Sequence, residues 1–420
     1  MTKFTKTLLA TSILLCFSAS SYAATGDDND YFGEKLTVDG ETVDSVGFTQ
    51  GKYEIGSSDT NDVVITSTAD NKYGLSLRDE NRSTKATILG KNISISSEKD
   101  RGVDVKFDTN LFIGDETTET INITGATYGV TALQRATATL QAKEVNIVAT
   151  AEKGTALHVQ NNSDTKGTAK VSIKADNVNL KGYIGVSAMS EAVVDIDANT
   201  YIEASSAILA RGDAKVTIND EGTHVVQIDG NLNFNYDEET SGTSVNAIIN
   251  LNLSGSNSYW KGNTLVSWGS GAPSDLGKLL VDNVTLNLKN GAQWIPSVIS
   301  ESTTEESGTQ YVALNNLFLD GGVVTIENVE QNVEVENLEG NGVINVATEL
   351  NQDGTFNTSK LSVGSGESTL NVNYNGINAD QISNPEEAFK SLEGAIQTGT
   401  ATVSQVQNIA EGDVDRKSVV

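Results

Sequence analysis

The chain has 420 residues, of which 28 are basic and 56 acidic, and it carries a net charge of −28 at neutral pH. Such an excess of acidic groups repels phosphate backbones and anionic headgroups, which argues against nucleic acid or an anionic membrane as a partner. The 38 glycines against 3 prolines, together with frequent Asn, Thr, Ser and Val, favour an all-β protein over a helical one.

Residues 1–23 have the pattern of a cleaved export signal. Two lysines precede an apolar run over 8–17, which is too short to span a bilayer. Ser21 and Ala23 supply the small side chains that signal peptidase requires. We expect export by the Sec machinery and cleavage between Ala23 and Ala24. The chain's one cysteine leaves with the signal, so the mature protein has no disulfides.

A series of repeats follows an expected N-terminal leader and cap at 24–70. Each unit opens with a glycine and continues with apolar residues at every second position, the period of a strand with one face packed inward. The units recur at intervals of about 25–31 residues, which is typical of solenoids. The opening glycines are Gly74, Gly102, Gly129, Gly154 and Gly185. The pattern predicts a parallel β-helix over 71–250, with two or three strands in each coil.

Three stretches of the repeat align without gaps and differ in their corners. They are "VTALQRATATL" at 130–140, "VSAMSEAVVDI" at 186–196 and "ILARGDAKVTI" at 208–218, with corners LQR, MSE and RGD. The third corner, Arg211-Gly212-Asp213, spells the tripeptide that animal integrins bind. Gly and Asp are ordinary turn residues, and sister coils place unrelated residues here, so turn chemistry explains the tripeptide. The corner faces outward, and a weak receptor-binding role stays open.

Two longer corners, Arg78 to Lys85 and Asn161 to Lys166, are predicted on one side of the coils. Tolerated insertion is the favoured interpretation. A contact surface is the alternative, because solenoids present binding loops at repeated corners.

Catalytic residues are not expected in this chain. The histidines are His158 and His224, and neither lies near a serine nucleophile motif. Asp195 and Asp197 share the outward face of one strand, at a spacing that suits glycoside hydrolysis or calcium. A solvated outer face is the favoured interpretation of the pair. We therefore expect no cofactor and no metal.

From about residue 250 the phrases become more specific. They are "GSNSYWKGN" at 255–263, "LLVDNVTLNLKNGAQW" at 279–294, "LNNLFLDGGVVTI" at 314–326, "VENLEGNGVINV" at 335–346 and "KLSVGSGESTLNV" at 360–372. In this order they resemble the passenger domains of bacterial autotransporters of the pertactin and AIDA type. The resemblance implies a right-handed, pectin-lyase-like β-helix, a handedness that strand crossovers in general prefer. It also implies an autochaperone-like segment within 251–380 and a place at or beyond the outer membrane of a Gram-negative bacterium.

The tail at 381–420 is expected to be a linker with one short helix. Asn384 suits the N-cap, Pro385 the first turn, and Glu386 and Glu387 the positive end of the helix dipole. Family members continue into an outer-membrane barrel, and the tail lacks the alternating strands of one. The barrel is thus expected to be missing from this chain.

These features together predict an exported, non-catalytic passenger that serves in surface display or adhesion, with a host-cell or bacterial-surface ligand as its partner. One alternative is a carbohydrate-active β-helix enzyme, which a cluster of Asp, Arg and Lys on adjacent coils would favour. A second alternative is a truncated product that stays in the periplasm.

Overall fold

The computed structural model describes residues 30–44, 47–48, 52–70, 72–79, 84–161, 167–236, 246–268, 283–298, 302–303, 308–377, 382 and 385–409. The predicted signal cleavage at Ala23 and Ala24 and parts of both long corners lie outside these residues. Within them the chain is all-β apart from one short α-helix and one 3-10 turn, and most strand pairs are parallel. The arrangement is consistent with a β-helix solenoid. The chain divides into two compact units, Met1–Ser187 with Glu191–Val193 and Ala188–Ser190 with Val194–Val420.

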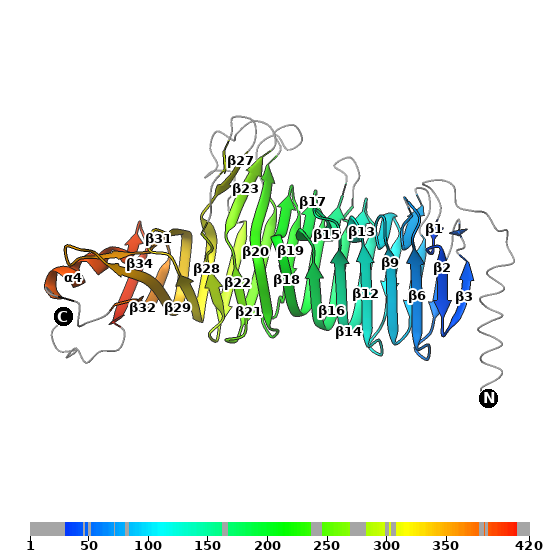
Figure 1. Ribbon diagram of the computed structural model, residues 1–420, viewed down its shortest axis with the longest axis horizontal. Coiled ribbons are helices and arrows are strands. Elements are labelled where there is room, and N and C mark those ends of the chain that lie inside the picture. Colours follow the sequence, from blue (N-terminus) through cyan, green and yellow to red (C-terminus); the bar gives the residue numbers. More distant parts are fainter. Residues whose placement is uncertain are drawn as a thin grey trace. The chain divides into compact units, whose positions relative to one another are not determined.

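The strands of the first unit lie side by side (Figure 1), and their parallel pairing defines three columns. The first column is β7 (Leu75–Asp79), β10 (Val103–Phe107), β13 (Tyr128–Leu133) and β15 (Thr155–Gln160). The second is β5 (Lys52–Gly56), β8 (Lys85–Leu89), β11 (Asn110–Ile113) and the first part of β14 (Thr137–Ala149). The third is β6 (Asp62–Ser67), β9 (Asn92–Ser97), β12 (Thr120–Gly125) and the second part of β14. Both parts of β14 pair with β16 (Lys170–Lys181).

Antiparallel strands close the N-terminal end of this stack. β2 (Lys35–Val38) pairs with β3 (Glu41–Asp44) and with β6, and β1 (Asp30–Tyr31) pairs with β4 (Gly47–Phe48) and β7. They cover strand edges that would otherwise offer free N–H and C=O groups. The parallel stack begins with β5 and β6, earlier than the predicted boundary at residue 71, because the alternation in "DVVITS" already matches that of β9.

Rows of aliphatic side chains fill the interior of the first unit. One row places Ile65, Ile95, Ile123, Ile147 and Leu180 in register on successive strands, and each is fully buried. Paired strands lie about 4.8 Å apart, so each side chain packs on its neighbours above and below. Each such burial contributes roughly 1.5–3 kcal/mol.

The opening glycines of the repeat mark places where coils approach closely. A Cβ on Gly74 would lie 2.6 Å from the carbonyl oxygen of Gly102, and one on Gly102 would lie 2.7 Å from that of Gly129. The next coil differs from the prediction, because Tyr128 pairs with Thr155. That register sets Ala156 beside Gly129. Gly154 instead ends a tight turn, in which its N–H donates to the carbonyl of Ala151.

Parallel strands of very different lengths make up most of the second unit. Its parallel strands are β18 (Val193–Arg211), β19 (Lys215–Ile218), β20 (Val226–Tyr236), β21 (Ile248–Ser254), β22 (Tyr259–Lys261), β23 (Thr264–Trp268), β24 (Val284–Lys289), β25 (Gln293–Ile295), β28 (Leu314–Ile326), β29 (Asn332–Leu350), β31 (Lys360–Ser365) and β32 (Glu367–Asn375). β17 (Ile184–Met189) lies at the boundary between the units. Antiparallel pairs join β27 (Gly308–Tyr311) to β23 and to β26 (Ser302–Thr303), and β30 (Phe356–Thr358) to β29. In Figure 1, β23 and β27 extend beyond the neighbouring strands.

The tail contains the expected helix and two strands that the sequence did not predict. Helix α4 (Pro385–Leu392) leads through the 3-10 turn η2 (Glu393–Ala395) into β33 (Ile396–Thr398) and β34 (Thr402–Ile409). β33 pairs with β31 and β34 with β32, both in parallel, so this part of the tail is not a linker. Without the tail, the edges of β31 and β32 would leave backbone N–H and C=O groups unpaired. β33 and β34 form hydrogen bonds with these groups.

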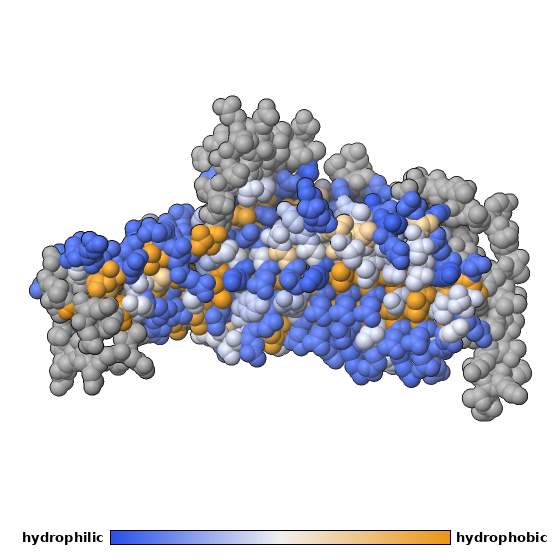
Figure 2. All heavy atoms as spheres, viewed as in Figure 1, coloured by the Kyte–Doolittle hydropathy of each residue, from blue (hydrophilic) through white to orange (hydrophobic). Residues whose placement is uncertain are grey.

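Polar side chains form rows on the outer faces of the coils. The side-chain amide of Asn146 donates to Asn122 at 2.9 Å, and that of Asn179 donates to Asn146 at 2.7 Å. Hydrophilic residues predominate among the described atoms of the face in Figure 2. Among the described helices, none is long and apolar enough to cross a membrane.

Candidate functional site

The Arg211-Gly212-Asp213 corner is the turn that joins β18 to β19. Asp213 is exposed, and the other two residues are half-buried. The N–H of Ser190, in the MSE corner, donates to the carbonyl of Arg211 at 2.9 Å, so these two corners stack as the alignment predicted. Gly212 has φ +64°, and Ser190 has φ +53°. The left-handed backbone is therefore a property of the corner and does not depend on glycine.

Asp195 and Asp197 lie on β18, and the structure gives Asp197 a partner that the sequence did not suggest. The Nε2 atom of His224 lies 3.1 Å from its Oδ1 atom. Within the described residues, no group of three or more His, Cys, Asp or Glu side chains could hold a metal ion.

A buried polar cluster crosses the first column of the first unit. Asp104, Thr131 and His158 are in register on β10, β13 and β15. Asp104 has no exposed surface, and its carboxylate accepts hydrogen bonds from Arg78 Nε at 2.6 Å, from Arg101 Nη1 and from the Thr131 hydroxyl. Burial alone would raise the pKa of Asp104, but the charges of Arg101 and Arg78 outweigh it and hold that pKa below its usual value.

Aromatic rings cover this cluster. The guanidinium of Arg78 lies 4.5 Å from the ring centroid of Tyr73, and that of Arg101 lies 5.2 Å from the centroid of Tyr128. The sequence predicted Arg78 as the first residue of a long corner, and that prediction is wrong, because Arg78 lies within β7 and its side chain is only 6% exposed. Successive coils carry a polar residue at the register position of Asp104, and this repetition could have indicated a buried polar cluster. Period-two alternation, however, assigns that position to the solvent-facing side.

His158 extends the cluster along the column. Its Nδ1 atom lies 3.0 Å from the Ser187 hydroxyl, and its Nε2 atom lies 3.2 Å from Gln160 Oε1. A neutral imidazole with its proton on Nε2 satisfies both bonds. Burial lowers the pKa of His158 to about 4, against the opposing effect of the Gln160 hydrogen bond. The ring is thus neutral at physiological pH.

Asp and Arg on adjacent coils are the arrangement that the enzyme alternative calls for. Here, however, both oxygens of Asp104 are engaged and the carboxylate has no access to solvent. A general acid or base must reach its substrate, directly or through one water. The Asp104 cluster therefore binds coils together and is not a catalytic pair.

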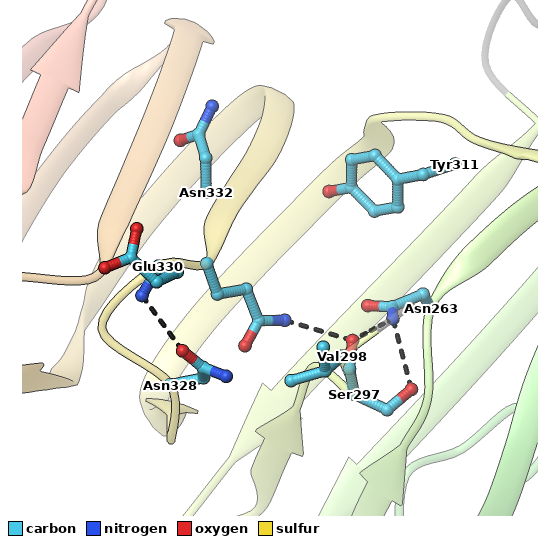
Figure 3. Close-up of a pocket in the computed structure, with 8 residues that line it drawn as sticks. Asn263, Ser297, Val298, Tyr311, Asn328, Glu330 and Asn332 are labelled. Carbon is cyan, nitrogen blue, oxygen red and sulfur yellow. Dashed lines mark hydrogen bonds between the residues drawn. The ribbon is translucent and has the colours of Figure 1, made fainter. Parts of the chain in front are cut away.

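An open polar cleft lies in the second unit (Figure 3). It has a volume of about 440 Å³. The residues that line it come from the segment between β22 and β23, the segment after β25, β27, and the turn that leads into the first residue of β29. They are Asn263, Ser297, Val298, Tyr311, Asn328, Glu330, Gln331 and Asn332. Four are amides and one, Glu330, is ionisable in the acidic range. Sequence reasoning missed this site, because its residues are far apart in the chain.

Two amides of the cleft share one acceptor. The amide nitrogen of Asn263 donates to the carbonyl and hydroxyl of Ser297, and that of Gln331 donates to the carbonyls of Pro296 and Ser297 at 3.2 and 3.1 Å. Because a carbonyl only accepts, these bonds fix both amide orientations. Among the residues that the structure describes, no donor reaches the side-chain oxygens of Asn263 and Gln331.

Tyr311 forms one wall of the cleft. Its hydroxyl accepts the N–H of Glu334 at 2.8 Å and lies 3.3 Å from the carbonyl oxygen of the same residue. Burial raises the pKa of Tyr311 to about 12. The contacts with Glu334 hold the Tyr311 ring in place, and Figure 3 shows the ring across the cleft from Asn328 and Glu330.

No protein-family model matches the chain, and no curated protein matches its sequence. The features that bear on function are therefore the stacked fold, the exposed corner and the cleft.

Proposed function

We propose that the chain is a right-handed parallel β-helix, exported as the passenger of an autotransporter-type protein. In this proposal it is displayed at the surface of a Gram-negative bacterium, or released from it, and acts as a non-catalytic adhesin. Sec-dependent export and loss of residues 1–23 belong to the same proposal.

The observation that supports adhesion most is the stack of in-register coils with polar outer faces. Interior aliphatic rows stabilise each coil on its neighbours, so a corner can vary without loss of the fold. Scaffolds of this kind present side chains in rows to a large partner surface, and they need no catalytic group. The outward amide row from Asn122 to Asn179 is one such row.

The carbohydrate-active alternative finds less support. Glycoside hydrolysis uses two carboxyl groups that flank the scissile bond. The cleft has one carboxylate, Glu330, among its described lining residues, and the Asp104 carboxylate is buried in ion pairs. The proposal therefore retains binding without turnover.

Adhesion can be tested with beads that carry the purified mature chain. We expect saturable attachment to host epithelial cells or to bacteria, and loss of attachment when the chain is heat-denatured before coupling. Attachment equal to that of the denatured chain would contradict adhesion. Release of reducing sugar from a polysaccharide panel would contradict the non-catalytic role.

A further inference from the structure

The cleft of the second unit has the size of a small-molecule site. Its volume of about 440 Å³ falls in the range of roughly 300–1,000 Å³ that ligand pockets occupy. Its lining residues come from four separate segments, whereas the outer faces of the coils carry rows of amides. The cleft is thus a local departure from the regular surface.

The lining favours a ligand that both donates and accepts hydrogen bonds. Asn263 is only 1% exposed, and within the described part of the chain neither its Oδ1 atom nor Gln331 Oε1 has a donor. A buried acceptor without a donor is unfavourable, and a ligand hydroxyl that enters the cleft far enough to reach these enclosed oxygens would relieve that cost. The exposed amide of Asn332 adds further donors and acceptors at the rim.

Apolar surface accompanies these polar groups. Val298 is 66% exposed at the edge of the cleft, and the Tyr311 ring stands on another side. An aromatic ring offers a large rigid face on which an apolar C–H surface can pack. Hydroxyl groups around an apolar ring face are the chemistry of a sugar.

Charge and strand pairing exclude other classes of ligand. The described lining has no basic residue, and Glu330 repels anions such as uronates, sialates and phosphates. An extended peptide would add to a free strand edge, but β27 pairs with β23 along its whole length and with β26 at Gly308 and Thr309, which leaves at most two residues of free edge.

We infer that this cleft binds a neutral carbohydrate through Asn263, Gln331 and Asn332, with Tyr311 and Val298 against its apolar face. The assignment of this cleft as the ligand site of an adhesin rests on the proposed function. Its assignment as a carbohydrate-binding site depends only on the geometry and chemistry of the cleft.

The test uses the full mature chain on an array of neutral and acidic oligosaccharides, followed by titration with the best neutral binder. Val298→Asp places a charge on the apolar edge at an exposed position that tolerates it. Val406→Asp is the matched control, an exposed valine of the same unit at 53% exposure on β34. We expect neutral glycans to bind, Val298→Asp to weaken binding by about tenfold or more, and Val406→Asp to leave it unchanged.

Glu330→Gln tests the selectivity of the cleft. The amide preserves the contact with Asn357, whose Nδ2 atom donates to Glu330 at 2.8 Å, and removes the charge. We expect unchanged binding of neutral glycans and new binding of acidic ones. Absence of neutral glycan binding, preference of the wild type for acidic glycans, or equal binding by the two valine variants would overturn the assignment.

The bead assay separates this inference from the proposed function. Adhesion that is unaffected by Val298→Asp, without glycan binding, overturns the carbohydrate site and leaves adhesion standing. Glycan binding by a chain that attaches to no cell supports the site and contradicts adhesion.

Discussion

The indole rings of Trp260 and Trp294 stack on neighbouring coils, with centroids 5.4 Å apart and planes inclined by 5°. Each indole N–H donates at 3.0 Å to a glycine carbonyl, Trp260 to Gly230 and Trp294 to Gly262. A Cβ on Gly262 would lie 2.8 Å from the Trp260 nitrogen, so glycine leaves room for the ring. The pair is a repeated device that fixes one coil on the next.

Replacement of Trp294 by alanine should destabilise the second unit by about 3–5 kcal/mol, because it removes a buried ring and leaves the Gly262 carbonyl without its donor. Thermal unfolding followed by circular dichroism measures the effect. Tyr183→Ala is the control, since Tyr183 is 46% exposed and should cost under about 0.5 kcal/mol. Equal shifts in the two variants would refute the packing role of the stack.

His158 should make the protein less stable as pH falls from about 6.5 to about 4. Its folded-state pKa of about 4 lies below the ordinary value of 6.5. Between these values the unfolded chain binds a proton that the folded chain does not, so protonation favours unfolding; above pH 6.5 neither state binds it. The full effect is at most about 3 kcal/mol.

His158→Gln should remove this pH dependence, and His224→Gln should retain it. The measurement is the unfolding midpoint of each protein at pH 7.5 and at pH 4.5. If wild type and His158→Gln lose the same stability between these conditions, the buried neutral imidazole is not its source. Asp104 also stabilises the folded state, because its pKa is lowered by folding. That stabilisation is lost as the pH falls through and below the ordinary value of 3.8, so it contributes little to the change between pH 7.5 and 4.5.

The Arg211-Gly212-Asp213 corner should behave as a turn. Asp213→Glu keeps the charge but spoils the fit to an integrin, and we expect no loss of adhesion to integrin-bearing cells. Gly212→Val should cost roughly 1 kcal/mol or more, because its φ is +64° and a Cβ would lie 3.2 Å from Ser190 Cα. Gly212→Asn should cost less, since asparagine tolerates this backbone. A large loss of adhesion by Asp213→Glu with the fold intact would make the tripeptide a ligand.

The exported chain should begin at Ala24. Small side chains at Ser21 and Ala23 set this site, and intact-mass measurement of protein recovered after export reads it directly. A mature chain that still carries Met1 would contradict the assignment.

The sequence predicted the all-β class and the stacking of the MSE and RGD corners, because period-two alternation and turn residues are local signals. The corner alignment of Ser190 with Gly212 holds in the structure for this reason. The prediction that Gly154 opens a repeat unit was wrong. A glycine can occupy a tight turn as readily as a place where two coils approach closely, and the sequence alone does not distinguish the two. The sequence did not predict β33 and β34, because their composition alone does not identify them as strands. They form strands because they pair with β31 and β32.

The cluster and the cleft could not be predicted from local pattern. Arg78 and Asp104 occupy positions that alternation assigns to solvent. Their burial depends on Arg101 and Thr131, which bond the Asp104 carboxylate, and on the Tyr73 ring that lies against Arg78. The cleft unites Asn263 with Gln331, which are distant in sequence and meet at the Ser297 carbonyl. The register between neighbouring coils determines which residues meet in the Asp104 cluster and in the cleft. The sequence of a single repeat does not specify that register.

The central claim is that the folded chain is displayed outside the cell. Addition of protease to intact Gram-negative cells that produce the chain, with a periplasmic protein as the internal control, tests it most directly. The account predicts digestion of this chain while the periplasmic control stays intact. Protection of the chain until the outer membrane is permeabilised would contradict surface display and place it in the periplasm.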